Sequence, residues 1–424
     1  MSAPGEDGGD WLGYREALEA VLEGVSRLGP EEVQREAALG RALTSDLRAR
    51  VRHPPWDNSA MDGFAVRSPD VTGAAPDDPV ELPVSDEVPA GGFPDGPLAP
   101  GTAVKVMTGA PVPEGATGVV RVEHTDGGEA GRVRIHRDDD ADRNIRRAGE
   151  DVEEGQRLLR AGDEITPAAC GVLAMNGFRA VETGRPPRVG ILATGDELAD
   201  FDAFDEVRAG RKVMNSNSRA LAAQVRSAGG RAVLLGIARD TRESLRERLG
   251  AASELDAVVS SAGVSVGEHD HVRDVLREAG MEEVFWRARI RPGSPLLFGL
   301  LPEDRPCWGL PGNPVSAMVT FEVFVRPALR KMAGHRALER RTVPARTRSE
   351  IRTRSDLTHF LRVVLRDERE SGERPAVELT GPQGSGILTS MTAADALLPV
   401  PEGTGTLAAG TPVGVLPLRE WRRP

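Results

Sequence analysis

Apolar and polar positions along the chain change their period several times, and each change predicts a different kind of element. Near the amino terminus, apolar residues from Trp11 to Leu28 recur at helical spacing, and Gly29-Pro30 would end that helix. Between residues 54 and 145, short β-rich pieces such as 103–107 and 118–122 alternate with Pro- and Gly-rich turns. A helix is expected again over 163–177, with Thr166 as its N-cap and Gly177 as its stop. This part of the chain therefore predicts a small β domain between helical segments.

Residues 188–334 alternate between apolar strands and amphipathic helices. We expect strands at 189–193, 232–237, 257–259, 284–290 and 296–299, and helices at 218–228, 242–249, 272–279 and 315–332. This alternation predicts a doubly wound α/β domain. From residue 335 onward the pattern is β-rich again, at 363–365, 377–379 and 411–416.

Composition restricts the class of protein. The chain has 424 residues, of which 39% are apolar and 28% are charged, enough for two or more packed domains. No apolar run approaches the ~18 residues of a membrane span, and the first ten residues lack the basic and apolar regions of a signal peptide. Cys170 and Cys307 cannot form a disulfide framework or a four-thiolate zinc site. We expect a cytoplasmic protein that does not bind membranes.

The charge balance narrows the choice of partners. The formal net charge of −11 argues against nucleic acid and suits divalent cations, although solubility alone would also explain it. Only Lys105, Lys212 and Lys331 are lysines, so arginine, backbone amides or a metal ion would have to bind any phosphate.

Unusual loops follow nearly every predicted strand of the α/β domain. They lie at 194–197, 239–240, 260–270, 291–295 and 309–314. In such a sheet, ligands bind beyond the carboxyl ends of the strands, where glycines let backbone N–H groups approach an anion. Glu197, Asp240 and Asp270 fall on this rim, and three carboxylates beside an anion would repel one another unless a hard cation such as Mg²⁺ joined them.

A nucleophile motif offers an alternative from another mechanistic class. The GVSVG string around Ser265 matches the G-x-S-x-G elbow of serine hydrolases, with Asp304 and either His335 or His359 in a permitted order. The helix should follow the elbow at once, however, and residues 267–270 intervene. Neither a P-loop nor a G-x-G-x-x-G motif after a strand is present.

Six strings in one order carry a family resemblance. They lie at 54–66 (with NSAMDG), 107–111, 147–151, 194–198, 263–267 and 309–317 (with LPGNPVSA). Together they resemble the molybdopterin molybdenumtransferase family, which includes MoeA and the E domain of gephyrin, over nearly the whole chain. The resemblance implies multi-domain α/β plus β architecture: a discontinuous elongated domain (11–53 and 141–185), an inserted small β domain (54–140), a molybdopterin-binding α/β domain (186–333) and a C-terminal β-barrel-like domain (334–424). It also implies a homodimer, with the site between the α/β domain of one subunit and other domains of its partner.

The resemblance further implies a reaction in which adenylylated molybdopterin and molybdate give molybdenum cofactor and AMP, with Mg²⁺ as cofactor. The upstream molybdopterin adenylyltransferase and recipient molybdoenzymes are implied protein partners. On matched positions, the residues assigned to catalysis are Asp62, Thr108, Asp151, Glu197, Asp240 and Asp270, with Mg²⁺ on Glu197, Asp240 and Asp270. Those assigned to the cofactor are Gly263, Ser265, Gly267, Arg291, Ser294, Pro311, Gly312, Asn313, Arg362 and Ser385.

Two positions depart from the family pattern. The family usually has Lys-Pro-Gly-Lys-Pro where this chain has Arg291-Pro292-Gly293-Ser294-Pro295, so Arg291 keeps one positive charge and Ser294 loses the other. Ala262 replaces a usual glycine. These departures leave open an alternative, a non-catalytic molybdopterin-binding paralogue or scaffold.

Overall fold

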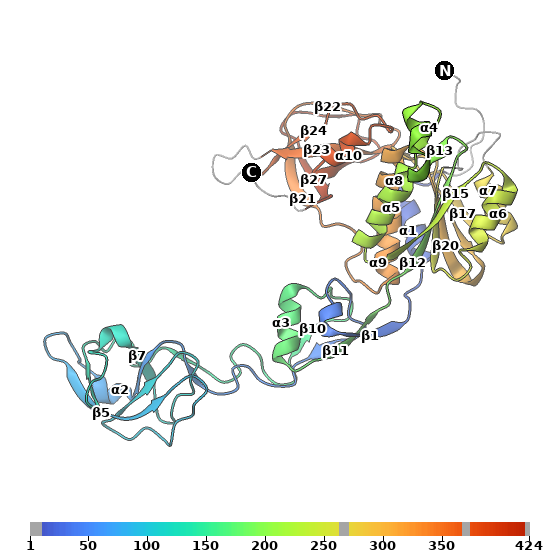
Figure 1. Ribbon diagram of the computed structural model, residues 1–424. Coiled ribbons are helices and arrows are strands. Elements are labelled where there is room, and N and C mark those ends of the chain that lie inside the picture. Colours follow the sequence, from blue (N-terminus) through green and yellow to red (C-terminus); the bar gives the residue numbers. More distant parts are fainter. Residues whose placement is uncertain (1–10, 263–270, 367–373, 420–424) are drawn as a thin grey trace. The chain divides into compact units, whose positions relative to one another are not determined.

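The computed structural model describes residues 11–262, 271–366 and 374–419. They form two compact units, each built from more than one segment of the chain (Figure 1). The large unit contains the described residues up to Ser45, Ala161–Cys170 and those from Arg179 onward. The inserted unit contains Asp46–Arg160 and Gly171–Phe178. The four-domain division stays a prediction.

The inserted unit is built on a five-stranded sheet with the order β7-β4-β6-β5-β8. Its strands are β4 (Gly63–Val66), β5 (Val80–Val88), β6 (Ala103–Val106), β7 (Gly118–Arg121) and β8 (Arg132–Ile135). The predicted strands at 103–107 and 118–122 are therefore confirmed. Gly63 is required where β4 meets β7, because a Cβ there would lie 2.0 Å from the carbonyl oxygen of Val120. Smaller elements are α2 (Ser68–Val71) and the pairs β2 (Leu47–Arg48) with β10 (Arg157–Leu159) and β3 (Asn58–Ser59) with β9 (Ile145–Arg146).

The first helix is shorter than the sequence pattern predicts. Helix α1 (Tyr14–Glu23) ends at Gly24, where a Cβ would lie 2.9 Å from the ring of Phe298. The chain then forms β1 (Pro30–Gln34), which pairs antiparallel with β11 (Ala180–Gly184). Helix α3 (Pro167–Met175) follows Thr166 as predicted, with the amide of Ala169 donating to the Thr166 hydroxyl at 3.2 Å. Gly177 follows it with φ +70°, which confirms the predicted stop.

A six-stranded mixed sheet organises the α/β part of the large unit. Its order is β15-β12-β16-β20-β19-β17, and its strands are β12 (Arg188–Thr194), β15 (Arg231–Ala238), β16 (Ala257–Ser261), β17 (Glu282–Trp286), β19 (Leu297–Leu301) and β20 (Arg305–Leu310). β15, β12, β16 and β20 are parallel, whereas β19 is antiparallel to both β20 and β17.

Two strand predictions in this sheet are corrected. The expected single strand over 284–290 is two elements, because the chain turns at Arg287, which has φ +92°. Its end becomes β18 (Ile290–Arg291), which pairs with a strand of the C-terminal sheet. β20 was not expected, because its Pro306 and Gly309 belong to residue types depleted in strands.

Helices cover both faces of this sheet (Figure 1). One face packs against α1, α5 (Ser216–Ser227), α8 (Pro314–Thr320), a π-helical turn over Phe321–Val325 and α9 (Arg326–Met332). The other packs against α6 (Arg242–Gly250) and α7 (Val272–Glu278), which share a core with Val258 and Leu301. The predicted doubly wound α/β domain is confirmed.

The C-terminal part of the large unit is a closed barrel. Strands β21 (Val343–Thr347), β24 (Ala376–Leu379), β23 (Thr358–Arg366), β25 (Ala396–Val400) and β27 (Pro412–Pro417) pair in a ring that returns to β21. Because β18 also pairs with β23, this sheet continues directly from the α/β part. The remaining elements are β13 (Leu198–Ala199), α4 (Phe204–Arg208), β14 (Val213–Met214), β22 (Ile351–Arg352), α10 (Thr389–Ala393) and β26 (Thr406–Leu407).

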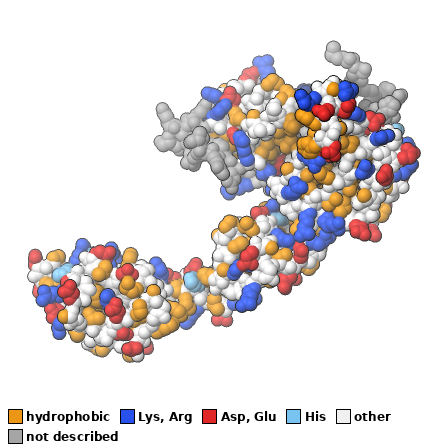
Figure 2. All heavy atoms as spheres, viewed as in Figure 1, with side chains coloured by type: hydrophobic (Ala, Val, Ile, Leu, Met, Phe, Trp, Pro, Cys, Tyr) orange, Lys and Arg blue, Asp and Glu red, His pale blue; other side chains and the backbone are white. Residues whose placement is uncertain are grey.

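Surface composition agrees with the sequence. Figure 2 shows acidic and basic side chains interspersed on the viewed face, so the net charge of −11 is not gathered into one patch there. No helix in the described parts of the chain is long and apolar enough to cross a membrane.

An ionisable cluster with a buried histidine lies at the end of α9. Arg330 contacts Glu164 at 2.9 Å and the Nδ1 atom of His335 at 3.1 Å, and His335 is only 3% exposed. Arg330 can only donate, so Nδ1 accepts this hydrogen bond and the imidazole is neutral. Burial, together with the charge of Arg330, lowers the pKa of His335 to about 4, although Glu164 opposes the shift.

This shift predicts an acid-dependent loss of stability. The folded pKa lies below the unfolded value, so His335 stabilises the fold above about pH 6.5, and this contribution is lost as the pH falls towards 4. We expect wild type to lose about 3 kcal/mol of unfolding free energy relative to His335→Asn over that range. Denaturant unfolding of the full chain at several pH values measures the difference. Parallel pH profiles for the two proteins would contradict this assignment.

Candidate functional site

The carboxyl ends of the parallel strands place several predicted residues on one rim. Thr194 ends β12, and its hydroxyl donates to Asp240 Oδ1 at 2.7 Å, while the amide of Asp196 donates to Asp240 Oδ2 at 3.2 Å. Asp240 is therefore held in place by the strand beside its own. Gly195 has φ +149°, a conformation almost confined to glycine, and its missing side chain leaves room for the carboxylate of Glu197.

Part of the predicted site lies outside the described residues. Gly263, Ser265, Gly267 and Asp270 fall in that segment, and so does the nucleophile motif of the hydrolase alternative. In the described part of the chain, no three His, Cys, Asp or Glu side chains gather as a metal site. The predicted magnesium ligands Glu197 and Asp240 are present on the rim, whereas Asp270, the third predicted ligand, lies outside the described residues.

The LPGNP turn lies against the loop that follows β16. Gly312 approaches Ala262 closely, because a Cβ on Gly312 would lie 3.2 Å from that of Ala262. Asn217, at the start of α5, donates to the carbonyl oxygen of Gly312 at 2.7 Å. Ala262 has φ +73°, the left-handed conformation that favours glycine, so the departure from the family glycine falls where the backbone demands one.

Asn313 does not cap α8 with its side chain, although it occupies the N-cap position after Pro311. Instead its Nδ2 donates to the hydroxyl of Ser385 at 3.1 Å, and the amide of Val315 donates to the carbonyl oxygen of Ser385 at 3.0 Å. Two predicted residues far apart in sequence are thus brought together, one from the α/β part and one from the barrel.

Arg362 is fully buried on β23. Its Nε donates to Ser390 Oγ at 3.1 Å and its Nη2 to the carbonyl oxygen of Gly384 at 3.0 Å. Gln383 accepts from the backbone amide of Arg362 at 2.8 Å. Nη1 has no partner, and among the described residues no carboxylate pairs with the guanidinium. Burial lowers the pKa of Arg362, so this cation is held at a cost that a bound anion would offset.

A pocket of about 440 Å³ joins Arg362 to a second predicted residue, Arg291. Arg352 and Arg354 also line it, but they pair with Glu350 and Asp356, so Arg291 and Arg362 supply its uncompensated charge. His359 lines the same pocket and accepts from the amide of Arg354 through Nε2 at 3.3 Å. Burial and the charge of Arg291 lower the pKa of His359, which keeps it neutral. The pocket therefore suits a small anion.

Ser294 takes no part in this pocket. Its hydroxyl donates to the carbonyl oxygen of Ile290 at 2.6 Å and so closes the turn after β18. Gly293 in the same turn has φ +103°, and a Cβ there would lie 2.3 Å from Thr320 Cγ2. Where the family usually has a lysine, Ser294 therefore has a hydroxyl that is hydrogen-bonded to the backbone.

The inserted unit holds another pair of predicted residues together. Thr108 donates from its amide at 2.6 Å and from its hydroxyl at 2.7 Å to the same oxygen, Asp62 Oδ1. These bonds hold the pKa of Asp62 below its usual range, the amide contributing more than the hydroxyl. Asp62 is therefore a solvent-facing carboxylate in a fixed orientation.

The string that contains Asp151 is fixed by a residue without an assigned role. Asp57 accepts from the amide of Ala148 at 2.8 Å and pairs with Arg147 at 2.6 Å. Asp151 itself donates its amide to the carbonyl oxygen of His53 at 3.2 Å. The structure thus connects the strings 54–66 and 147–151, although no residue in the described parts of the chain pairs with the Asp151 carboxylate.

Sequence reasoning missed residues that position the others. These are Asp57, Thr194, Asn217, Gln383 and Ser390. Asp57 and Thr194 lie inside the quoted strings, so their position there was an available signal. Asn217 and Ser390 reach their partners through tertiary contacts, which the spacing of residues in the sequence does not indicate.

Family models match three consecutive parts of the chain. The MoeA N-terminal region (domain I and II) matches residues 12–177, the probable molybdopterin binding domain matches 190–331, and the MoeA C-terminal region (domain IV) matches 344–418. With the rim and the barrel, these matches define a multidomain protein of molybdenum cofactor biosynthesis.

Whole-chain relatives agree. The molybdopterin molybdenumtransferase of Nostoc sp. is 35% identical over 397 residues, which cover 93% of this chain and 90% of the relative. Molybdopterin molybdenumtransferase 2 of Mycobacterium tuberculosis is 37% identical over 409 residues, 95% and 98% of the two chains. The molybdopterin biosynthesis moeA protein of Pyrococcus horikoshii OT3 matches in structure with a TM-score of 0.81 at 30% identity, over 96% of this chain and 99% of that chain. The chain belongs to the molybdopterin molybdenumtransferase family of transferases.

The geometry of Arg362 predicts that replacing this residue weakens anion binding. Arg362→Gln should weaken sulfate or molybdate binding by about tenfold or more, because a charged hydrogen bond contributes about 1.5–3 kcal/mol. Isothermal titration calorimetry measures the affinity. Arg366→Gln, at the exposed end of the same strand and paired with Glu378, is the matched control and should change little. Equal affinities for the two variants would contradict the assignment of Arg362 to the anion pocket.

Proposed function

We propose that the protein inserts molybdate into adenylylated molybdopterin and releases AMP in a Mg²⁺-dependent reaction. The observation that carries the proposal is Arg362, a buried residue that lines the same pocket as Arg291 and whose Nη1 has no partner among the described residues. Molybdate is a tetrahedral dianion, and two guanidinium groups that pair with no carboxylate of the described residues supply matching charge. Membership of the molybdopterin molybdenumtransferase family supports a molybdopterin as the organic substrate. The hydrolase alternative receives no support from the relatives.

The opposite side of the proposed site would hold the pterin and its phosphate. Pro311, Gly312 and Asn313 form the turn that precedes α8, and Gly312 lies against Ala262. Exposed backbone at such a turn can approach a flat ring or a phosphate closely. The bond between Asn313 and Ser385 supports a site in which the pterin turn and the anion pocket act together. We assign Gly263, Ser265 and Gly267 to the phosphate on the family pattern.

Carboxylates on the rim would serve the cleavage of the phosphoanhydride bond. Asp240 and Glu197 offer oxygen ligands of the kind Mg²⁺ prefers, and Asp270 would complete the set. Bound there, the ion would neutralise charge on the phosphates as AMP leaves. Thr194 and the amide of Asp196 orient Asp240 for this role. Asp62, which is held by Thr108, and Asp151 would act from the inserted unit.

We propose a homodimer in which the inserted unit of one chain completes the site of another. Each unit has exposed apolar side chains beside its share of the predicted residues. In the inserted unit, Met61 and Met107 flank Asp62 and Thr108 in sequence, and both methionines are exposed. In the large unit, Phe201, Phe204 and Val213 follow Glu197, and all three are more than half exposed. Contact between two copies would remove these apolar surfaces from water.

Single-turnover chemistry tests the reaction. Purified protein with adenylylated molybdopterin, molybdate and Mg²⁺ should release AMP, and omitting either molybdate or Mg²⁺ should prevent the release. Asp240→Asn should slow release by about 100-fold or more, because it removes a fixed charge from the reacting centre. Asp202→Asn, an exposed carboxylate nearby in sequence, is the control and should stay within about twofold of wild type.

Tight pterin binding without AMP release would overturn the transferase proposal. That result would favour the non-catalytic paralogue. The serine at position 294, where the family usually has a lysine, is the observation that supports this alternative.

Complementation tests the shared site. Asp62→Asn and Asp240→Asn chains should each be inactive, whereas a re-equilibrated equal mixture should recover about a quarter of wild-type sites, since half of the dimers are mixed and each has one intact site. The rate of AMP release measures the recovery. If both residues acted within one chain, every chain in the mixture would lack one of them and no activity would return.

A further inference from the structure

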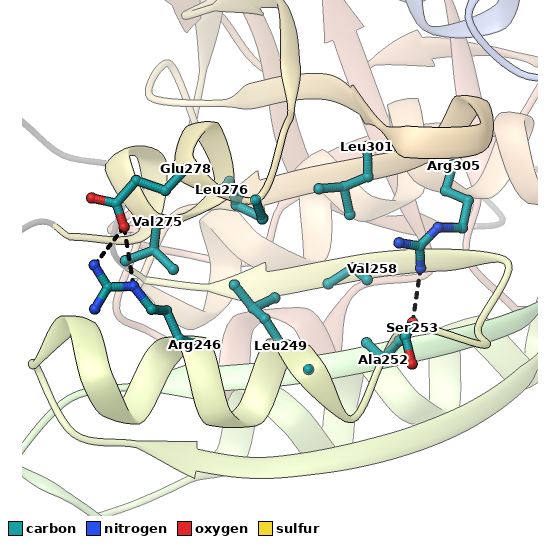
Figure 3. Close-up of a pocket in the computed structure, with 12 residues that line it drawn as sticks. Arg246, Leu249, Ala252, Ser253, Val258, Val275, Leu276, Glu278, Leu301 and Arg305 are labelled. Carbon is teal, nitrogen blue, oxygen red and sulfur yellow. Dashed lines mark hydrogen bonds and ion pairs between the residues drawn. The ribbon is translucent and has the colours of Figure 1, made fainter.

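A second cavity lies at the opposite edge of the α/β sheet. It has a volume of about 310 Å³ and opens between α6 and α7, at the amino ends of β16 and β20 (Figure 3). The predicted catalytic rim follows the carboxyl ends of the parallel strands, so this cavity is separate from it. None of the residues assigned to the proposed reaction lines it.

The interior of the cavity is apolar. Leu249 of α6, Leu276 of α7 and Leu301 of β19 line it, with Val258 on the sheet and Val275 beside it. Figure 3 shows these side chains directed into one space between the helices and the sheet. Val258, Val275 and Leu276 belong to the core on this face of the sheet and are almost fully buried. A ligand entering here would extend the existing core.

The two ends of the cavity differ in charge. At one end, Arg246 pairs with Glu278 at 2.7 Å (Figure 3), and Arg242 pairs with the same carboxylate at 2.6 Å. At the other end, Arg305 donates from Nη1 to the carbonyl oxygen of Ala252 at 2.9 Å, and from Nε to that of Pro302 at 3.2 Å. Among the described residues no carboxylate pairs with Arg305, and Ser253 beside it has a hydroxyl without a side-chain partner.

The balance of charge at the Arg305 end favours an anion. The carbonyl groups near the end of α6 contribute a partial negative charge, about half an elementary charge for a helix terminus. Arg305 carries a full positive charge, so the net field remains positive. A guanidinium with a free terminal nitrogen and a neighbouring hydroxyl can bind the two oxygens of a carboxylate.

We propose that this cavity binds a small amphiphilic monocarboxylate, with its apolar body among Leu249, Val258 and Leu276 and its carboxylate on Arg305 and Ser253. The size is sufficient, because an apolar cavity of about 150 Å³ accommodates benzene. A cavity of about 310 Å³ therefore has room for one ring with a short carboxylate chain. The Arg246–Glu278 pair lies at the end that the apolar body approaches.

Calorimetric titration of the full chain with phenylacetate and with 2-phenylethanol tests the proposal. The two probes share a ring and differ in charge. We expect saturable binding of phenylacetate, several times tighter than that of the alcohol. Arg305→Gln should weaken phenylacetate by about tenfold and change the alcohol little, because it removes one charged hydrogen bond. Leu249→Trp should abolish binding of both by filling the space.

Three further variants separate binding in this cavity from other effects of the substitutions. Arg248→Gln makes the same kind of change on α6, outside the cavity, and should leave both affinities unchanged. If Arg305→Gln loses its cooperative thermal transition, Ser253→Ala replaces it, with an expected weakening of phenylacetate of about fivefold. Asp240→Asn should bind phenylacetate normally, which separates this cavity from the proposed reaction. Absence of saturable binding, binding that survives Leu249→Trp, or equal affinity for acid and alcohol would overturn the proposal.

Discussion

The parallel register of four neighbouring strands determines where chemistry can occur in this protein. Because β15, β12, β16 and β20 run in the same direction, all their carboxyl ends open at one edge of the sheet. Loops that are far apart in sequence are forced together there, and Asp240 is bonded to Thr194 across adjacent strands. Moving any one strand would separate these loops. The apolar faces that hold the register are therefore also what holds the site.

Arginine, and not lysine, supplies the positive charge of the proposed anion site, and the consequence is geometric. A guanidinium can satisfy two neighbours and still present a donor to a ligand, which an ammonium does less directionally. Arg362 shows this: it binds Ser390 and Gly384, and one terminal nitrogen remains unpartnered. With Ser294 bonded to the backbone, Arg291 and Arg362 supply the charge of this pocket. The site thus relies on a buried cation whose burial is costly unless an anion is present.

Much of the fold follows from local pattern, and the failures have physical causes. Helices that begin at a capping residue and end at glycine, such as α3, were predictable, and so were the apolar strands β12, β15 and β16. β20 was not, because Pro306 and Gly309 are disfavoured in strands and only burial between two neighbours stabilises them there. The split at Arg287 depends on pairing with a strand about 70 residues later in the chain. The proposed roles of Asp62, Asp240 and Arg362 came from the family resemblance, and the strand pattern by itself already placed Asp240 on the rim, whereas the residues that orient them depend on tertiary contacts.

The insertion of one unit into the other has a consequence for synthesis on the ribosome. The inserted unit is complete once Phe178 has emerged, whereas Leu18 and Val21 of α1 share a core with α9, which is complete only at Met332. A helix of ten residues is marginal in water without tertiary contacts. At ~5–20 residues per second, α1 therefore waits roughly 10–30 s for its partners after the inserted unit is complete. During that interval its apolar face is exposed, so a helix that is made before the inserted unit is buried long after it.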